Sequence, residues 1–194
     1  MIGNILNIDF YKRDTSTVAR ELIGKILVRK YPDSKSTEIL SGIITETEAY
    51  YGDDDPASHA YRGITQRSKI MFGRPGIAYV YFCYGVHYML NAVTEKKDTP
   101  GAVLIRAVRP VSGIELMIAN RKVSDTRSLT DGPGKLTQAF EIDLKDNGKD
   151  LTEAGSCLNI YSSAIRTGSI KISISNRIGL SKGREKQLRF IMKN

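Results

Sequence analysis

The sequence predicts an α+β fold, a single domain built around a largely antiparallel sheet. Its 194 residues, 41% of them hydrophobic, can bury one sizeable core but not two ordinary ones. No internal repeat, low-complexity tract or Pro/Ser-rich linker divides the chain. Strand-like and helix-like segments mix without the regular alternation that a parallel sheet requires. We therefore expect one domain over residues 1–194.

Three segments carry the signals of helices. One is expected from Ser16, because residues 14–16 offer side chains that cap a helix N-terminus. A second is expected from Ser112, which matches the capping-box pattern with Glu115. A third is expected near Pro133, since proline is favoured in the first turn of a helix.

Strands are expected where β-branched and aromatic residues gather or alternate with polar ones. Gly85 interrupts one such region and predicts a hairpin, which makes the neighbouring strands antiparallel. In the segment EILSGIITETEAY, period two would place Ile44, Glu46, Glu48 and Tyr50 on one face. The expected strands cover residues 26–29, 38–50, 77–85, 86–95, 102–110, 158–161, 170–174 and 188–192.

Basic residues exceed acidic ones and gather in two stretches. The net charge is +8, which favours a polyanionic partner such as nucleic acid or an anionic membrane surface. From residue 161 to 194 a single acid, Glu185, opposes eight basic residues, and residues 62–74 hold a second acid-free group. Asp53, Asp54 and Asp55 are expected to form a solvated turn. Either basic stretch could also be ordinary solvated surface. The residues expected to contact phosphate are Arg177, Lys182, Arg184 and Lys186.

Several classes of protein do not fit the sequence. Cys83 and Cys157 are too few for a disulfide framework and lie in apolar contexts, so we expect reduced, buried thiols in a cytoplasmic protein. His59 and His87 lack the spacing of zinc sites, and no phosphate-binding glycine loop or zinc deaminase signature is found. We expect no metal or cofactor. No apolar run approaches the ~20 residues of a membrane span, so a membrane is not an expected partner.

Two groups of residues have the types that catalysis on a planar ligand needs. In ETEAY, Glu48 would be a general base and Tyr50 one wall for the ligand, although both could instead lie on an ordinary solvated strand face. Four tyrosines surround the expected hairpin turn: Tyr79, Tyr81, Tyr84 and Tyr88. Such aromatics usually belong to a core, but a tyrosine at a hairpin tip beside basic loops suits a protein that stacks on bases.

Longer strings of the sequence resemble one family. GIITETEAYYGDDDPASHAYRG, MFGRPGIAYVYFCYGVHYMLN, GAVLIRAVRP and DGPGKLTQAF are similar, in order and spacing, to 3-methyladenine DNA glycosylases of the alkyladenine type. The similarity runs from about Thr15 to the C-terminus and indicates a compact bacterial-type member. It implies a curved sheet and a monomer without cofactor. It also implies hydrolysis of the N-glycosidic bond of alkylated or deaminated purines in double-stranded DNA, the class of 3-methyladenine, 7-methylguanine, hypoxanthine and ethenoadenine.

The resemblance also implies roles for individual residues. Glu48 would be the general base, and Arg106 would help to hold the nucleophilic water and the sugar-phosphate. Asn91 would screen the edge of the base, and Tyr84 would fill the space that the flipped base leaves in the duplex. The residues implied to enclose that base are Tyr50, His59 and Tyr81.

Two other functions explain part of the sequence. A nucleic-acid-binding domain without catalysis would account for the basic stretches and the tyrosines, but it leaves Glu48 beside Tyr50 without a purpose. A phosphate- or RNA-directed hydrolase would account for the charge, but the sequence lacks the carboxylate cluster that would bind its metal ions.

Overall fold

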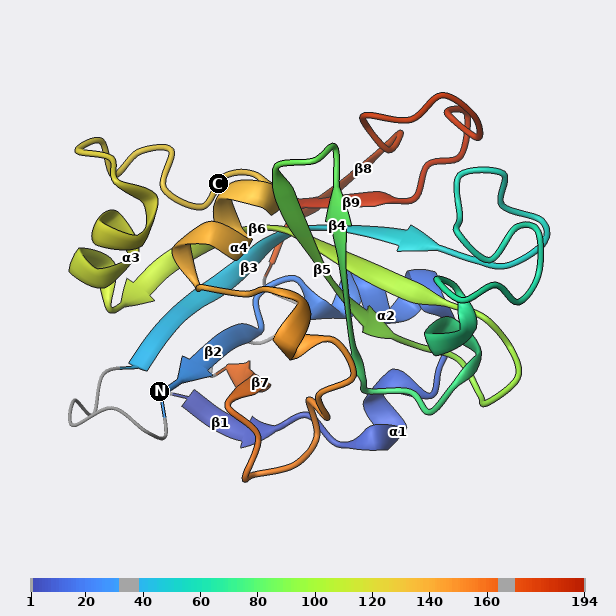
Figure 1. Cartoon of the computed structure of the whole chain (residues 1–194), viewed down its shortest axis with the longest axis horizontal. Coiled ribbons are helices and arrows are strands. Elements are labelled where there is room, and N and C mark those ends of the chain that lie inside the picture. The colour runs from blue at the N-terminus through green and yellow to red at the C-terminus, as the bar shows by residue number, and fades with distance from the viewer. Residues whose placement is uncertain (1, 32–38, 164–169, 194) are drawn as a thin grey trace.

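The structure is a computed structural model that describes residues 2–31, 39–163 and 170–193. Within these ranges nine strands form one open, antiparallel sheet in the order β1-β7-β2-β3-β6-β5-β4, and β9 pairs with β3 and β8. Figure 1 shows this arrangement. The strands are β1 (Ile2–Ile5), β2 (Ile26–Lys30), β3 (Ile39–Tyr50), β4 (Ala78–Cys83), β5 (His87–Val93), β6 (Ala102–Ser112), β7 (Leu158–Ser163), β8 (Ile172–Ser175) and β9 (Arg189–Met192).

Short helices complete the domain. The predicted α+β class and the antiparallel sheet are confirmed. The helices are α1 (Ile8–Tyr11), α2 (Thr15–Leu22), α3 (Ile114–Arg121) and α4 (Pro133–Ala139), with two 3₁₀ turns, η1 (Lys69–Phe72) and η2 (Leu144–Asp146).

Local signals explain where two of the predicted helices begin. Asp14 caps α2, because its carboxylate accepts a hydrogen bond from the Thr17 N–H at 2.8 Å. Pro133 is the first residue of α4, as predicted. The predicted start at Ser112 is wrong. Ser112 is the last residue of β6 and pairs with Ser41, so α3 begins at Ile114 after Gly113, whose φ is 73°.

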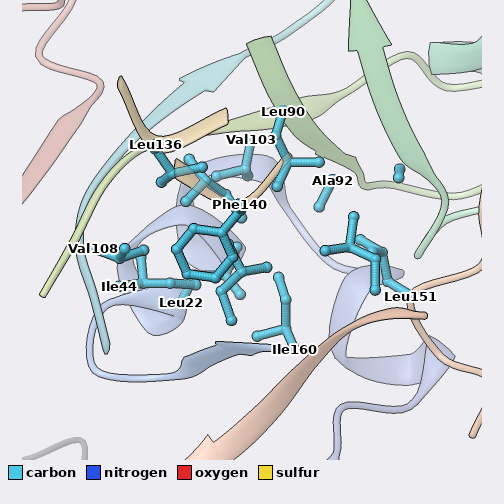
Figure 2. Packing of buried hydrophobic residues seen from close by; sticks show 14 of the residues in the cluster. Leu22, Ile44, Leu90, Ala92, Val103, Val108, Leu136, Phe140, Leu151 and Ile160 are labelled. Atoms are coloured by element: carbon cyan, nitrogen blue, oxygen red, sulfur yellow. The ribbon is translucent and has the colours of Figure 1, made fainter. Parts of the chain in front are cut away.

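The main hydrophobic core lies between α2, α4 and one face of the sheet. Figure 2 shows Phe140 surrounded by aliphatic side chains that include Leu22 of α2 and Ile44 of β3. These three side chains are completely buried. The Thr47 hydroxyl, on the same face of β3, donates to the Ala19 carbonyl of α2 at 2.7 Å. This face of the sheet is therefore filled, and any open site must use the other face.

A break in register changes the face of one predicted residue. Ile44 pairs with Val108 but Glu46 pairs with Ala107, so Thr45 is an extra residue, a β-bulge. The prediction that Ile44 shares a face with Glu46 is wrong, because the bulge shifts the alternation by one and leaves Ile44 in the core. Beyond the bulge, Glu46, Glu48 and Tyr50 do share a face, opposite Thr47 and the helices.

Candidate active site

A pocket of about 340 Å³ opens on the face of the sheet that the helices do not cover. Strict alternation along three strands separates it from the core. Ala78, Val80, Leu90, Ala92, Val103 and Ile105 belong to the core, while the residues between them line the pocket: Tyr79, Tyr81, Met89, Asn91, Leu104 and Arg106. Alternate residues of the same strands therefore form the hydrophobic core on one face and the pocket lining on the other.

Glu48 is held directly behind the pocket wall. Its side chain is completely buried and accepts three hydrogen bonds. The Tyr50 hydroxyl donates to Oε2 at 2.7 Å, Arg106 donates to Oε2 at 3.3 Å, and the Ile178 N–H donates to Oε1 at 3.0 Å. All three donor residues line the pocket. A carboxylate has about four acceptor positions, so one remains for a further donor.

Arg106 lies between two carboxylates. Its Nε donates to Glu46 at 2.7 Å, and the same Glu46 oxygen accepts from Arg189 of β9 at 2.7 Å. The guanidinium is largely buried, with 12% of its side chain exposed. Ion pairs on both sides keep the Arg106 side chain in place at the pocket wall, next to Glu48.

Aromatic rings form the opposite wall. The rings of His59 and Tyr81 meet edge to face with centroids 4.6 Å apart, and the His59 Nδ1 lies 2.8 Å from the Tyr79 hydroxyl. Arg67 lies over the Tyr81 ring at 4.6 Å. Burial, followed by the nearby Arg67 charge, lowers the pKa of His59 to about 4. The imidazole is therefore neutral at physiological pH and can present an acceptor or a donor without carrying charge.

Tyr84 stands at the tip of the β4–β5 hairpin, at the mouth of the pocket. Its side chain is 78% exposed, and its hydroxyl lies 3.4 Å from the Gly179 carbonyl on the loop between β8 and β9. Tyr84 and Gly85 have φ of 54° and 71°, as a type I′ turn requires. This region costs an L-residue about 1 to 2 kcal/mol. Tyr84 therefore combines an exposed ring with a backbone conformation that L-residues rarely adopt.

Asn91 is fixed on the floor of the pocket. Its side chain is almost fully buried, and its amide nitrogen donates to the carbonyls of Tyr79 at 3.1 Å and Met89 at 3.4 Å. The structure therefore brings together seven of the predicted site residues: Glu48, Tyr50, His59, Tyr81, Tyr84, Asn91 and Arg106.

Arg177 does not belong to the DNA-contacting group predicted for it. Its side chain is fully buried and forms a two-pronged ion pair with Asp55, with both N–O distances 2.6 Å. The prediction of a phosphate contact is wrong, because no surface of this guanidinium is free to meet DNA. The predicted solvated turn at residues 53–55 is wrong for Asp55, which is also fully buried, while Asp53 and Asp54 are exposed.

The other predicted phosphate contacts lie on the loop between β8 and β9. Lys182 and Arg184 are exposed, whereas Lys186 is half-buried and forms an ion pair with Asp54 at 3.6 Å. The same loop reaches the pocket through Ile178, Gly179 and Leu180. The exposed Lys182 and Arg184 therefore share a loop with part of the pocket lining.

The structure adds features that the sequence did not indicate. Ile178 contributes its backbone N–H, which no side-chain pattern in a sequence can indicate. Asp55 is buried against Arg177, which is far from it along the chain. Cys83 and Cys157 are free thiols, but they are partly exposed rather than buried as predicted, and Cys83 lines the pocket.

The described residues offer neither a cluster of metal ligands nor a membrane-spanning helix. They contain no group of three or more His, Cys, Asp or Glu side chains that could hold a metal ion. Among the helices of this part of the chain, none is long and apolar enough to cross a membrane.

Comparisons with known proteins agree with the geometry of the site. The model of the methylpurine-DNA glycosylase (MPG) family matches residues 9–194. Three similar proteins carry the name "Putative 3-methyladenine DNA glycosylase". Those of Prosthecochloris aestuarii and Carboxydothermus hydrogenoformans are 48% and 46% identical, over 93% and 95% of this chain and 84% and 93% of their own. That of Ehrlichia chaffeensis is 42% identical over 97% of this chain and 93% of its own.

These matches cover almost the whole chain, and they exclude the alternative of a binding domain without catalysis. The chain belongs to the methylpurine-DNA glycosylase family and is a DNA glycosylase, an enzyme of DNA repair.

Proposed function

We propose that this glycosylase flips an alkylated or deaminated purine out of duplex DNA into the pocket. There a water activated by Glu48 hydrolyses the N-glycosidic bond, and the enzyme acts as a monomer without a cofactor. One observation carries the proposal: a fully buried carboxylate whose three hydrogen-bond donors all line an aromatic pocket. The lesions in question belong to the class of 3-methyladenine, 7-methylguanine, hypoxanthine and ethenoadenine.

The depth of the pocket supports base flipping. Glu48 has no exposed surface, so a base that remained stacked in a duplex could not reach it. Extruding a nucleotide costs a few kcal/mol, and the cost is smallest for a damaged or mispaired base. The exposed Tyr84 ring at the pocket mouth would offset this cost by stacking in the space that the base leaves.

The arrangement around Glu48 suits a hydrolytic role. Cleavage of a glycosidic bond passes through a sugar with oxocarbenium character, which a nearby carboxylate stabilises. Tyr50, Arg106 and the Ile178 N–H hold the carboxylate in one orientation, and its remaining acceptor position would take a hydrogen bond from the attacking water. Water is the proposed nucleophile rather than an amine, since no lysine is among the described residues that line the pocket.

The aromatic wall suits a purine, and a cationic one in particular. Tyr81, Tyr79 and the neutral His59 offer ring faces and edges, and an electron-rich tyrosine face attracts a cationic ring more strongly than a neutral one. Alkylation at a ring nitrogen makes a purine cationic and a better leaving group. The side chain of Asn91, held by two backbone carbonyls, would meet the edge of such a base.

The test is excision from a duplex that contains one hypoxanthine, in EDTA, followed by alkaline strand cleavage. The Glu48→Gln variant keeps the size of the side chain and should still bind the lesion. Its single-turnover excision rate should fall by ~10²-fold or more, as expected when a general base is lost. Asp125→Asn changes an exposed acid that forms an ion pair with Arg127, and it serves as the control.

Three results would contradict the proposal. Excision by Glu48→Gln at nearly the wild-type rate would remove Glu48 from the role of base. Borohydride trapping of a covalent protein–DNA adduct would show that an amine, not water, is the nucleophile. Loss of wild-type excision in the presence of EDTA would show that the enzyme needs a metal ion.

A further inference from the structure

The ion pair between Arg177 and Asp55 is enclosed more completely than any other described in the protein. Both side chains have no exposed surface, and two parallel N–O contacts of 2.6 Å join them. Taking two charges out of water is expensive, and a buried ion pair is often no more stabilising than apolar side chains of the same size. Fold stability alone is therefore a weak reason for its presence.

The pair ties together three segments that surround Glu48. Arg177 lies on the loop between β8 and β9, and Asp55 lies on the loop that follows β3. Arg177 also donates to the Ala49 carbonyl at 2.9 Å, next to Glu48 on β3, and to the Gly183 carbonyl at 3.2 Å. Asp55 in turn accepts from the Tyr51 N–H at 3.0 Å. Figure 1 shows the two loops on the same side of the molecule.

Two of the three donors that hold Glu48 depend directly on Arg177. Ile178 is the next residue, and its N–H donates to the Glu48 Oε1. Tyr50, whose hydroxyl donates to Oε2, has its ring 4.6 Å from the Arg177 guanidinium. Burial and then the Glu48 charge raise the pKa of Tyr50 far above its ordinary value, so the hydroxyl keeps its proton and remains a donor.

The charge of the pair persists over the pH range in which the enzyme would act. Burial opposes ionisation of Asp55, but the hydrogen bonds from Arg177 and from the Tyr51 N–H, together with the Arg177 charge, outweigh it and lower the pKa of this carboxyl. Neither Arg177 nor Asp55 lines the pocket. The loop has other ties, such as the partly exposed ion pair of Lys186 with Asp54 and the contact of the exposed Tyr84 with Gly179, but neither of these is a buried charge pair.

We infer that Arg177 and Asp55 are positioning residues for the reaction. Their ion pair fixes the Ile178 N–H and the Tyr50 hydroxyl on the two oxygens of Glu48, so that the carboxylate points at the reacting sugar. The inference rests on the proposed role of Glu48 as the base. A displacement of a reacting group by about 1 Å can cost roughly 10²-fold in rate, so a loosened loop would reduce excision without any loss of a contact to DNA.

The experiment measures single-turnover excision with enzyme in excess, together with the fraction of active enzyme and the affinity for lesion duplex. Arg177→Lys keeps the charge but loses the two-pronged contact, and Asp55→Asn keeps the shape of its side chain. We expect either variant to lower the excision rate constant by about 10- to 100-fold. Lesion affinity should stay within about threefold of wild type. A purely structural role would instead lower the active fraction and leave the rate constant of the folded molecules unchanged, which would overturn the inference.

A matched control uses the second largely buried Arg–Asp pair. Arg29 on β2 contacts Asp146 at 2.5 Å, with 13% and 1% of their side chains exposed, and neither residue lines the pocket. Arg29→Lys also changes a largely buried Arg–Asp ion pair, here with a single N–O contact, and should leave the excision rate constant unchanged. A rate loss equal to that of Arg177→Lys would show that any damaged ion pair slows the enzyme, and the positioning role would fall.

A double-mutant cycle separates this inference from the function on which it rests. If Arg177 acts through Glu48, Arg177→Lys should have little further effect on the residual rate of Glu48→Gln. Equal fold losses in both backgrounds would overturn the positioning role while leaving Glu48 as the base. Wild-type excision by Glu48→Gln alone would instead remove the base itself. Should Arg177→Lys fail to fold, Asp55→Asn carries the same cycle.

Discussion

The two faces of the sheet formed by β3, β6, β5 and β4 are built from alternate residues of the same strands, yet they differ in character. The core face carries aliphatic side chains packed around Phe140, and most have no surface exposed. The opposite face leaves a hollow of about 340 Å³ lined by tyrosines, histidine and arginine. Both faces are buried, so burial alone does not separate structure from function here.

The two faces differ in the hydrogen-bond partners of their polar side chains. On the core face, polar side chains bond to the backbone, as Thr47 does to Ala19. On the pocket face, charged side chains bond to one another, as Arg106 does with Glu46 and Glu48, and Arg106 itself lines the cavity. A change on the core face should therefore lower stability without altering the chemistry. A change on the pocket face should alter the chemistry with little effect on stability.

The largest expected effect is on the core face. Phe140→Ala empties the centre of the cluster in Figure 2 and should lower the free energy of unfolding by about 3 to 5 kcal/mol. The single-turnover excision rate constant of the molecules that remain folded should not change. Denaturant titration and excision at low temperature measure the two quantities. Ile174→Ala, at a position 46% exposed, is the control and should change stability by about 0.5 kcal/mol or less.

On the pocket face, Tyr84→Ala should weaken binding to lesion duplex by ~1 to 3 kcal/mol, the range for loss of an aromatic stack. The free energy of unfolding should hardly change, because the ring is exposed. Tyr84→Phe is the matched control, since it keeps the ring and removes only the hydroxyl contact to Gly179. The loss should be much smaller on single-stranded substrate, which has no gap to fill. Equal losses on both substrates would mean that Tyr84 does not stack in the duplex.

Asn91→Ser tests whether the floor of the pocket selects the base. A rigid amide can reject the 2-amino group of guanine by steric overlap, and a smaller side chain should relieve it. We expect excision of undamaged guanine opposite a mismatched base to rise about tenfold. Activity on hypoxanthine should fall only modestly. Asn91 could instead stabilise the strands through its bonds to Tyr79 and Met89. A lower melting temperature with a uniform loss of activity would favour that structural role.

The smallest effect is expected at the surface of the loop between β8 and β9. Each phosphate contact removed should reduce the slope of log affinity against log salt by about 0.9. Lys182→Ala and Arg184→Ala should each do so, whereas Lys186→Ala should have less effect because Asp54 already neutralises part of its charge. Non-specific duplex binding measured between low and moderate salt gives the slope. An unchanged slope in the double alanine variant would make these residues ordinary solvated surface.

The sequence alone determined the class of fold and most of the strands, and it predicted seven residues that the structure brings together at the pocket. The fold class and the strands depend on local signals, whereas His59, Asn91 and Arg106 were predicted from the resemblance to a family. Alternation along a strand sends Tyr79 and Tyr81 to one face and Val80 to the other, and Gly85 permits the turn that presents Tyr84. The short β1 lacked such a signal, because three of its four residues are exposed.

Tertiary structure decided the features that depend on distant parts of the chain. The bulge at Thr45 arises where β3 exchanges its partner β2 for β9, and no local pattern marks that change. In the sequence, Arg177 is one of several basic residues near the C-terminus. In the fold its ion-pair partner is Asp55, which lies 122 positions away along the chain. Charge in a sequence predicts attraction to a polyanion. Only the folded chain determines whether a given arginine meets DNA or neutralises a carboxylate inside the protein, because the nearest opposite charge is set by three-dimensional proximity.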